Sequence, residues 1–278
     1  MIVARFGDTW QNAYRLGTLE AEETDEVQRS PTLQEVGGAH GAFDFAAASP
    51  WPLKPKEINR TFSVASETFQ GIDKAVEELK GALLGVGRSK VWGVLRDGST
   101  RRWAWGKCVG LSTRETRGQY FSKAVTARFL LPEGVWYGET QNSFTSPTIS
   151  GGALTYQTTL TNRGNLPMPI YTEIAPSASG IFTSFQMTNA VNNYRWTFSG
   201  SPDQIGAIIV DSGMFKCEYL KLSPFQVKPG YPYLAYGELV PQLNWMLLQP
   251  GANTVTIDIT MSAYDAWFVI FQWYDLYL

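Results

Sequence analysis

The last third of the chain alternates apolar and polar residues in short runs that are separated by turn residues. Within Leu248 to Ile259, Pro250 and Gly251 end one run, and β-branched residues then alternate with polar ones. This pattern predicts a strand, a tight turn and a second strand. Asn253 is expected to accept the unusual backbone conformation at the exit of that turn.

The whole second half continues in this way. Its best strand candidates are Leu154 to Thr161, Pro169 to Ile174, Phe182 to Thr188, Tyr194 to Phe198, Ile205 to Val210, Phe215 to Leu220, Asn253 to Met261 and Trp267 to Tyr274. Asp211, Ser212 and Gly213 are expected to join two of them as a hairpin. Because no helical period interrupts the series, residues 151–278 are predicted to form an antiparallel β-sandwich of jelly-roll or lectin-like type.

The first half contains one convincing helical pattern. Its apolar stripe recurs at spacings of three and four and consists of Phe69, Ile72, Val76, Leu79 and Leu83. The opposite side carries Asp73, Lys74, Glu77, Glu78 and Lys80. Ser66 or Thr68 is expected to cap the start of this helix, and Gly85 with Gly87 to end it.

Strands follow this helix. Val91 to Arg96 and Ser99 to Trp105 are predicted to form a hairpin, since Asp97-Gly98 suits a two-residue turn. Tyr120 to Leu131 is expected to be a further strand, with one face formed by Phe121, Val125, Ala127 and Phe129. Residues 1–139 are therefore predicted to be an α+β domain, a small sheet with one helix packed on it, and the whole chain to be mainly β.

Two segments fit neither domain. Residues 17–60 combine an acidic block with scattered apolar residues and little periodicity, so we expect a long arm that orders on a partner. Residues 140–150 are rich in Ser and Thr and contain no charged residue, so they are expected to be a linker. The charge distribution supports this boundary, because residues 1–135 hold 18 of the 23 Lys and Arg and residues 136–278 hold 5.

Composition excludes several function classes. A net charge of -2 argues against a general nucleic-acid binder. The longest apolar runs, such as Ile205 to Val210, are far shorter than the about 20 residues of a membrane-spanning helix. Arg5 and Asp8 come too early for the apolar core of a signal peptide, so synthesis and assembly in a cytoplasm are expected, without membrane insertion.

Catalytic and cofactor motifs are few. The single histidine, His40, lies in a Gly-Gly-Ala-His-Gly sequence that suits neither a general base nor a metal ligand. Cys108 and Cys217 form no C-x-x-C pair, and no phosphate-binding loop or H-E-x-x-H sequence is present. No cofactor, metal or catalytic residue is therefore expected.

Two surfaces are predicted to bind other proteins. The acidic Glu20, Glu22 and Glu23 and a basic, Trp-rich stretch in the same domain suggest pairing between subunits; the basic stretch contributes Arg101, Arg102, Trp103 and Trp105. In the second half, an aromatic set suggests a docking or sugar-stacking surface, although it is about as compatible with a core. Its members are Tyr231, Tyr233, Tyr236 and Trp245.

Both halves together resemble the distal tail proteins of long-tailed bacteriophages. The residues that carry the resemblance are Thr161 to Ile174 (TNRGNLPMPIYTEI), similar to the family's N-x-G-N-x-P-x-P strand entry, and Trp245 to Ile257 (WMLLQPGANTVTI), similar to its L-x-P-G-x-N-x-[VI] hairpin. The resemblance implies an N-terminal ring-forming domain and a galectin-like sandwich. It also implies a homo-oligomer, a hexameric ring in the virion, which joins the tail tube protein to the tail tip or baseplate and docks tip and receptor-binding proteins.

Two alternatives remain open at the level of the sequence. A lectin-like module would use the sandwich aromatics with Asn and Asp donors to bind sugars. A glycoside hydrolase would need two carboxylates in a cleft, for which Glu173 with Glu218 or Glu238 are the candidates.

Overall fold

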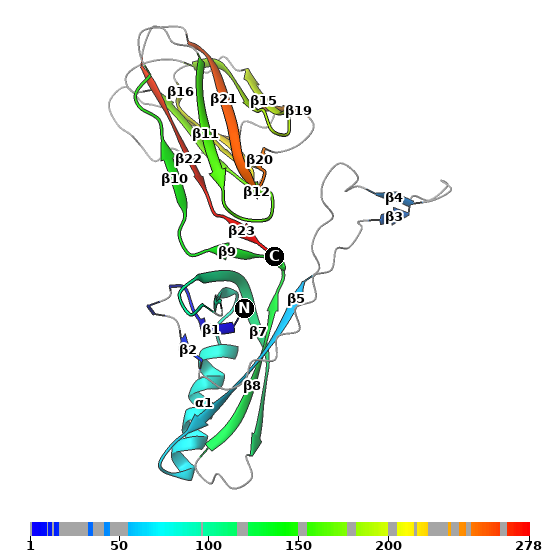
Figure 1. Cartoon of the computed structure of the whole chain (residues 1–278), viewed down its shortest axis with the longest axis vertical. Coiled ribbons are helices and arrows are strands. Elements are labelled where there is room, and N and C mark those ends of the chain that lie inside the picture. Colours follow the sequence, from blue (N-terminus) through cyan, green and yellow to red (C-terminus); the bar gives the residue numbers. More distant parts are fainter. Residues whose placement is uncertain are drawn as a thin grey trace. The chain divides into compact units, whose positions relative to one another are not determined.

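The computed structural model describes residues 2–9, 11–12, 14–16, 33–35, 42–44, 55–95, 97–115, 122–149, 155–176, 182–199, 205–213, 216–221, 233–234, 239–242, 246–261 and 266–278. The acidic block and most of the predicted arm lie outside these residues. The chain divides into two compact units (Figure 1), which are residues 1–139 with Leu278, here unit 1, and residues 140–277, here unit 2.

Unit 1 is built on an antiparallel sheet in the order β2-β1-β6-β7-β8-β5. Its strands are β1 (Ile2–Phe6), β2 (Tyr14–Arg15), β5 (Lys56–Ala65), β6 (Ser89–Val94), β7 (Arg101–Glu115), β8 (Ser122–Leu131) and β9 (Trp136–Gly138), the last of which pairs with β7. Two short strands, β3 (Leu33–Glu35) and β4 (Ala42–Asp44), pair with each other inside the predicted arm. The end of that arm was predicted too far along the chain, because residues 56–60 belong to β5.

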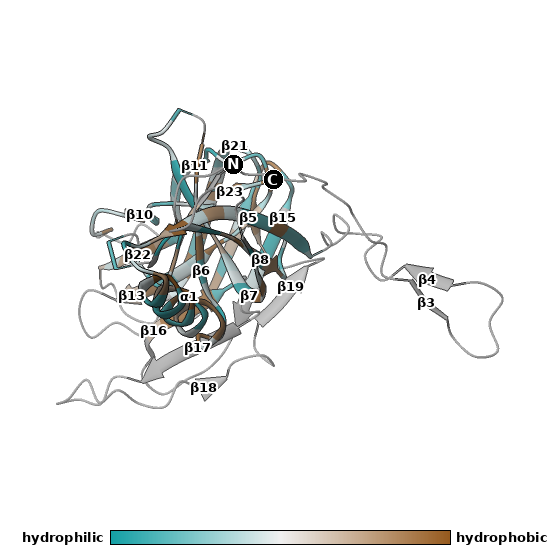
Figure 2. Cartoon of the chain, turned by 90° about the horizontal axis from the view of Figure 1, so that it is seen from below, coloured by the Kyte–Doolittle hydropathy of each residue, from teal (hydrophilic) through white to brown (hydrophobic). Residues whose placement is uncertain are grey.

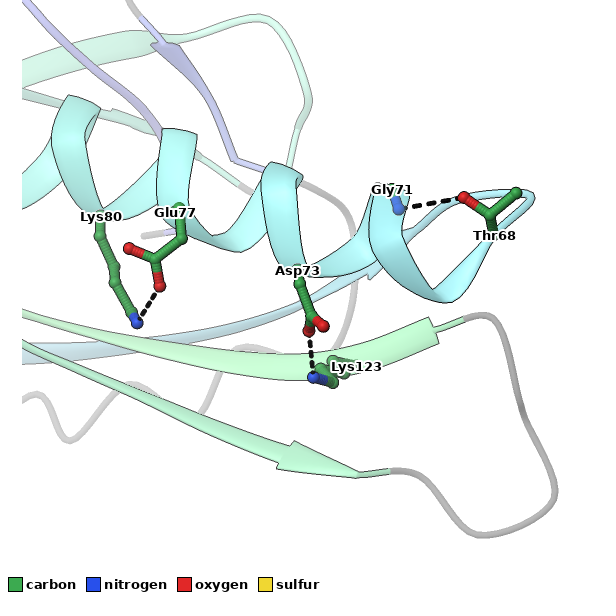
Figure 3. A network of polar contacts seen from close by, with 6 residues as sticks. All are labelled: Thr68, Gly71, Asp73, Glu77, Lys80 and Lys123. Carbon is green, nitrogen blue, oxygen red and sulfur yellow. Dashed lines mark hydrogen bonds and ion pairs between the residues drawn. The ribbon is translucent and has the colours of Figure 1, made fainter.

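Helix α1 (Phe69–Leu84) is the predicted amphipathic helix. Thr68 is its N-cap, since the Thr68 hydroxyl accepts a hydrogen bond of 3.0 Å from the backbone N–H of Gly71 (Figure 3). The polar side carries the ion pair between Lys123 and Asp73 at 2.7 Å and the pair between Lys80 and Glu77 at 2.6 Å. Figure 2 looks along the helix and separates its hydrophilic and hydrophobic sides.

The core of unit 1 lies between α1 and the sheet. Four residues of the predicted stripe are buried, namely Ile72, Val76, Leu79 and Leu83. The fifth, Phe69, is 59% exposed at the first position of the helix. On the sheet, buried pairs in register are Ile58 opposite Phe129 and Phe62 opposite Val125. Each such apolar side chain contributes about 1.5 to 3 kcal/mol to stability.

The hairpin between β6 and β7 differs from the predicted two-residue turn. The connection runs from Leu95 to Thr100, and the Leu95 N–H donates a hydrogen bond of 2.9 Å to the Thr100 carbonyl. Within it, Gly98 has a φ of +73°. The Asp97 carboxylate accepts hydrogen bonds from the N–H groups of Ser99 and Thr100, each at 2.9 Å, and from the Thr100 hydroxyl. These bonds lower the pKa of Asp97 to about 2, and the bond from the Thr100 hydroxyl has the largest effect. The Asp97 side chain therefore shapes a longer loop.

Unit 2 is a sandwich of two antiparallel sheets. One has the order β10-β22-β13-β16-β17-β18, with β10 (Asn142–Thr145), β13 (Tyr171–Pro176), β16 (Ile205–Asp211), β17 (Lys216–Lys221), β18 (Tyr233–Leu234) and β22 (Trp267–Trp273). The other has the order β11-β21-β14-β15-β19, with β11 (Thr155–Asn162), β14 (Phe182–Asn189), β15 (Tyr194–Ser199), β19 (Leu239–Gln242) and β21 (Gly251–Met261). The eight predicted strands are all present, and so is the hairpin between β16 and β17.

Alternate residues of the two sheets meet in one core. Examples are the T-shaped contact between Tyr156 and Trp267, with ring centres 6.3 Å apart, and the contact between Thr172 and Met187. Trp196, Phe271 and Ile257 are almost completely buried. This is the alternation that the sequence pattern predicts for a sandwich.

The predicted linker is part of this sandwich. Residues 142–145 form strand β10, which pairs with β22 from Asn142 opposite Trp273 to Thr145 opposite Ile270. Further along, the Ser146 hydroxyl accepts a hydrogen bond of 3.0 Å from the Val269 N–H, and Ile149 forms a β-bridge with Trp267. An edge strand of this kind is held largely through its backbone, so a composition rich in Ser and Thr does not reveal it.

Buried asparagines close one end of the sandwich. Asn253 is fully buried; its side-chain oxygen accepts from the Gln249 N–H at 2.8 Å, and its amide donates to the carbonyls of Gln249 and Gly251. Asn189 donates to the Asn253 oxygen at 3.1 Å. The positive φ of this turn, +96°, belongs to Gly251, so the role predicted for Asn253 was wrong: its side chain holds the turn and its backbone is an ordinary strand.

The motif Thr161 to Ile174 is also held by a buried asparagine. Asn162 is buried and donates to the carbonyls of Leu166 and Leu248, while its oxygen accepts from the Gly164 N–H. A Cβ at Gly164 would lie 2.1 Å from the Leu276 carbonyl oxygen, so only glycine fits there. Around this loop lie the short strands β12 (Met168–Pro169) and β20 (Leu247–Leu248), which pair with each other, and β23 (Leu276–Tyr277).

Candidate assembly surface

One face of unit 1 gathers aromatic and basic side chains from three strands. In register, Trp92 of β6 lies opposite Trp103 of β7, and Trp103 lies opposite Tyr137 of β9. Trp105 lies opposite Lys90 on the same face. We call Trp92, Trp103, Trp105 and Tyr137 the aromatic cluster.

Trp103 is the centre of the aromatic cluster. Its ring stacks on Tyr137 with centres 4.3 Å apart and an angle of 10°, and it meets Trp105 edge-on at 5.5 Å. Trp92 lies 6.5 Å away and donates from Nε1 to the Gly7 carbonyl at 3.0 Å. With 3% of its surface exposed, Trp103 belongs to the core of unit 1. The geometry removes it from the predicted interface surface.

Basic residues cover the outer side of the aromatic cluster. The Lys90 ammonium lies 4.3 Å from the centre of the Trp103 ring, and the Arg88 guanidinium lies 5.1 Å from that of Trp105. Such cation–π contacts contribute about 0.5 to 2 kcal/mol, depending on their exposure. Lys90 and Trp105 are half-buried, and Arg88 is exposed with its charge paired to that of Glu133.

Glu133 connects the two ends of this arrangement. Its carboxylate pairs with Arg88 and accepts a hydrogen bond of 2.6 Å from the Tyr137 hydroxyl. Burial raises the pKa of Tyr137 well above its ordinary value, and the hydrogen bond to Glu133 raises it further. Tyr137 therefore stays protonated and remains a hydrogen-bond donor across the physiological pH range.

The two predicted interface arginines lie on opposite faces of β7. Successive side chains of a strand alternate, so Arg101 shares the face of Trp103 and Trp105, whereas Arg102 shares the face of the buried Ala104. Arg101 donates to Glu139 at 3.0 Å. Both arginines are half-buried. Glu20, Glu22 and Glu23 lie outside the described residues.

Sequence reasoning missed part of the site. Lys90 and Trp92 lie in the basic, Trp-rich stretch that the sequence indicates, and they alternate like Trp103 and Trp105 on one mixed face of a hairpin. Glu133 and Tyr137 carry no such signal, because β9 is three residues long and its pairing with β7 is a long-range contact.

The other predicted residues of unit 2 are placed only in part. Tyr231, Tyr236 and Trp245 lie outside the described residues, and for Tyr233 the structure describes the backbone, which pairs with Tyr219. Glu173 and Glu218 stand in one cross-strand row with Ile209 between them, and Glu238 is outside the described residues.

Within the described ranges, no group of three or more His, Cys, Asp or Glu side chains is arranged to hold a metal ion. The helix found there is not long and apolar enough to cross a membrane.

Comparison with known proteins gives matches at the level of structure. No family model matches the chain, and no curated protein matches it in sequence. The crystal structure of Dit from phage SPP1, described as a paradigm of the hub adsorption apparatus in phages that infect Gram-positive bacteria, matches with a TM-score of 0.58 and 15% identity. The match covers 93% of this chain and 92% of Dit. The phage P2 baseplate in its activated conformation with Ca matches at 8% identity and a TM-score of 0.42, over 94% of this chain and 93% of that one.

The likeness to SPP1 Dit extends over both units. The chain therefore has the fold of Dit; its described residues are mainly β with one helix, and the fold class predicted from the sequence is confirmed.

Proposed function

We propose that the chain is a structural protein of a bacteriophage tail, which forms a ring between the tail tube and the tail tip or baseplate. The observation that carries this proposal is the match to SPP1 Dit over 93% of the chain, since it extends over both unit 1 and unit 2. The motifs Thr161 to Ile174 and Trp245 to Ile257 add support, because the buried Asn162 and Asn253 give both a structural reason.

In this proposal unit 1 forms the ring. A closed ring lets one surface and its complement serve every junction between copies. The basic side of the aromatic cluster, with Arg88, Lys90 and Arg101, is one such surface, and the acidic Glu20, Glu22 and Glu23 provide opposite charge. Trp105 belongs to this surface and the buried Trp103 supports it from below, whereas Arg102 lies on the opposite face of β7.

Unit 2 then docks tip or receptor-binding proteins at the tip of the virion. Residues 136–278 contain only 5 of the 23 basic residues of the chain, which leaves no patch for a polyanion such as DNA.

Charge reversal at the proposed junction is expected to weaken the ring. The full chain should sediment as a particle near six times 31.0 kDa, and Arg101→Glu should shift it toward monomers, with a larger effect at low salt. The matched control is the double variant Arg101→Glu with Glu139→Arg, which restores the internal ion pair with reversed polarity. Loss of the ring in both variants supports a junction; rescue by the double variant would assign Arg101 to internal stability alone.

A further inference from the structure

The two outer faces of the sandwich differ in chemistry. Strand β21 alternates cleanly: Val255, Ile257 and Ile259 are buried, and the residues between them, Thr254, Thr256 and Asp258, face outward. Its neighbours continue this polar face, where the Thr155 hydroxyl donates to Asp258 at 2.7 Å and Gln157 donates to Thr256 at 3.2 Å. This is the pattern of a sheet whose outer face is in water.

Strand β22 does not alternate in this way. Trp267, Val269 and Phe271 are buried in the sandwich, yet Phe268 and Ile270 on the outer side are apolar as well and half-buried. Antiparallel strands with one solvated face normally place polar residues outward, and continuous apolar runs mark strands that are covered on both faces. The sequence of β22 therefore fits a sheet that is covered on its outer face.

Strand β16 extends this apolar surface on one side of β13, whereas at the other edge of the sheet the exposed Thr145 of β10 lies opposite Ile270. Ile209 of β16 and Ile270 of β22 lie on either side of Glu173 in one cross-strand row, and Phe268 lies in the next row, opposite Ala175. Tyr171 is on the same face, and its hydroxyl donates to the Glu173 carboxylate at 3.2 Å. We call Tyr171, Glu173, Ile209, Phe268 and Ile270 the apolar outer face.

The charges on the apolar outer face indicate what kind of surface covers this face. Glu173 stands between two isoleucines, and the outward positions of β10, β13, β16 and β22 contain no Lys or Arg. Two copies that met through this face about a two-fold axis would bring Glu173 toward its own equivalent. Burying like charges without a counter-ion is unfavourable, so the complementary surface must carry a Lys or Arg among apolar side chains.

We infer that the apolar outer face docks a second tail protein that presents apolar side chains around a Lys or Arg, and that this base pairs with Glu173. The inference rests on the proposed tail function and specifies which face of the sandwich is used. The hydroxyl-rich face of β11 and β21 is left in solvent.

Site-specific cross-linking in assembled tails tests this directly. Phe268 is replaced by the photoreactive p-benzoylphenylalanine, which preserves an aromatic ring, and Thr256 on the opposite outer face is replaced in the matched control. Irradiation of purified tails should link position 268, and not position 256, to a peptide of another tail protein. Glu173→Lys should lower the yield of that product about tenfold, and Glu173→Gln should lower it less.

Each other outcome overturns the inference. A product that joins two copies of this chain would show that the apolar outer face contacts another copy and not a second tail protein. Tails that contain the chain but give no product at position 268, or equal products at both positions, refute the docking face and leave the tail function standing. Tails that lack the chain refute the tail function and the inference with it.

Discussion

The substitution Asn253→Ala is expected to lower the free energy of unfolding of unit 2 by about 3 kcal/mol or more. It removes the acceptor for the Gln249 N–H and for the Asn189 amide, and the donor to the carbonyls of Gln249 and Gly251. These groups lie where Asn253 is fully buried, so water cannot replace the lost bonds. Amide hydrogen exchange in β14 and β21 of the full chain measures the effect, with the amides of β8 as an internal reference.

Asn192→Ala is the graded control for this prediction. Asn192 is half-buried and donates to the Leu247 carbonyl at 2.9 Å, so about 1 kcal/mol is expected. Equal effects of the two substitutions would show that Asn253 does not organise the turn.

Trp103→Ala is expected to destabilise unit 1 by about 3 to 5 kcal/mol, the range for deleting a large buried aromatic side chain. The substitution opens a cavity beneath Lys90 and removes the stacking partner of Tyr137. The measurement is hydrogen exchange in β6 and β7, together with urea unfolding of the full chain followed by fluorescence.

Trp105→Ala provides the comparison, because Trp105 is half-buried on the same face and its loss leaves no closed cavity. A smaller loss of stability is expected there, with Trp103→Phe between the two alanine variants. If Trp103→Ala left unit 1 as stable as the wild-type protein and abolished ring formation, Trp103 would be an interface residue after all.

The sequence predicted the elements in which local pattern and burial agree. Strands β14 and β21 alternate apolar and polar residues over most of their length, β16 and β22 are apolar runs, and α1 has apolar residues at spacings of three and four, so each pattern indicates a buried element. The predicted ends lie close to those of the structure because Gly, Pro and Asn mark the turns.

Elements held by the backbone were not predictable in this way. β10 is an edge strand whose only apolar residue is Phe144, and β9, β12 and β20 are only two or three residues long, too short for a period to be visible. Their pairing depends on strands distant in the chain, such as Asn142 with Trp273.

Side-chain roles were the least predictable part of the candidate site. A Trp-rich basic stretch suggests a surface, but the third strand, β9, covers Trp103 with Tyr137 and makes it core. Asp97 and Asn253 were interpreted through backbone propensity, whereas each acts through hydrogen bonds from its side chain. Such bonds depend on the final loop geometry, which composition does not encode.

Electron microscopy of virions labelled with gold-conjugated antibodies against the chain tests the central claim most directly. The account predicts gold at the distal end of the tail, where the tube meets the tip, in virions of the phage that encodes the chain. Gold on the head or along the tail shaft, or virions that bind no antibody although they contain intact tails, would contradict it.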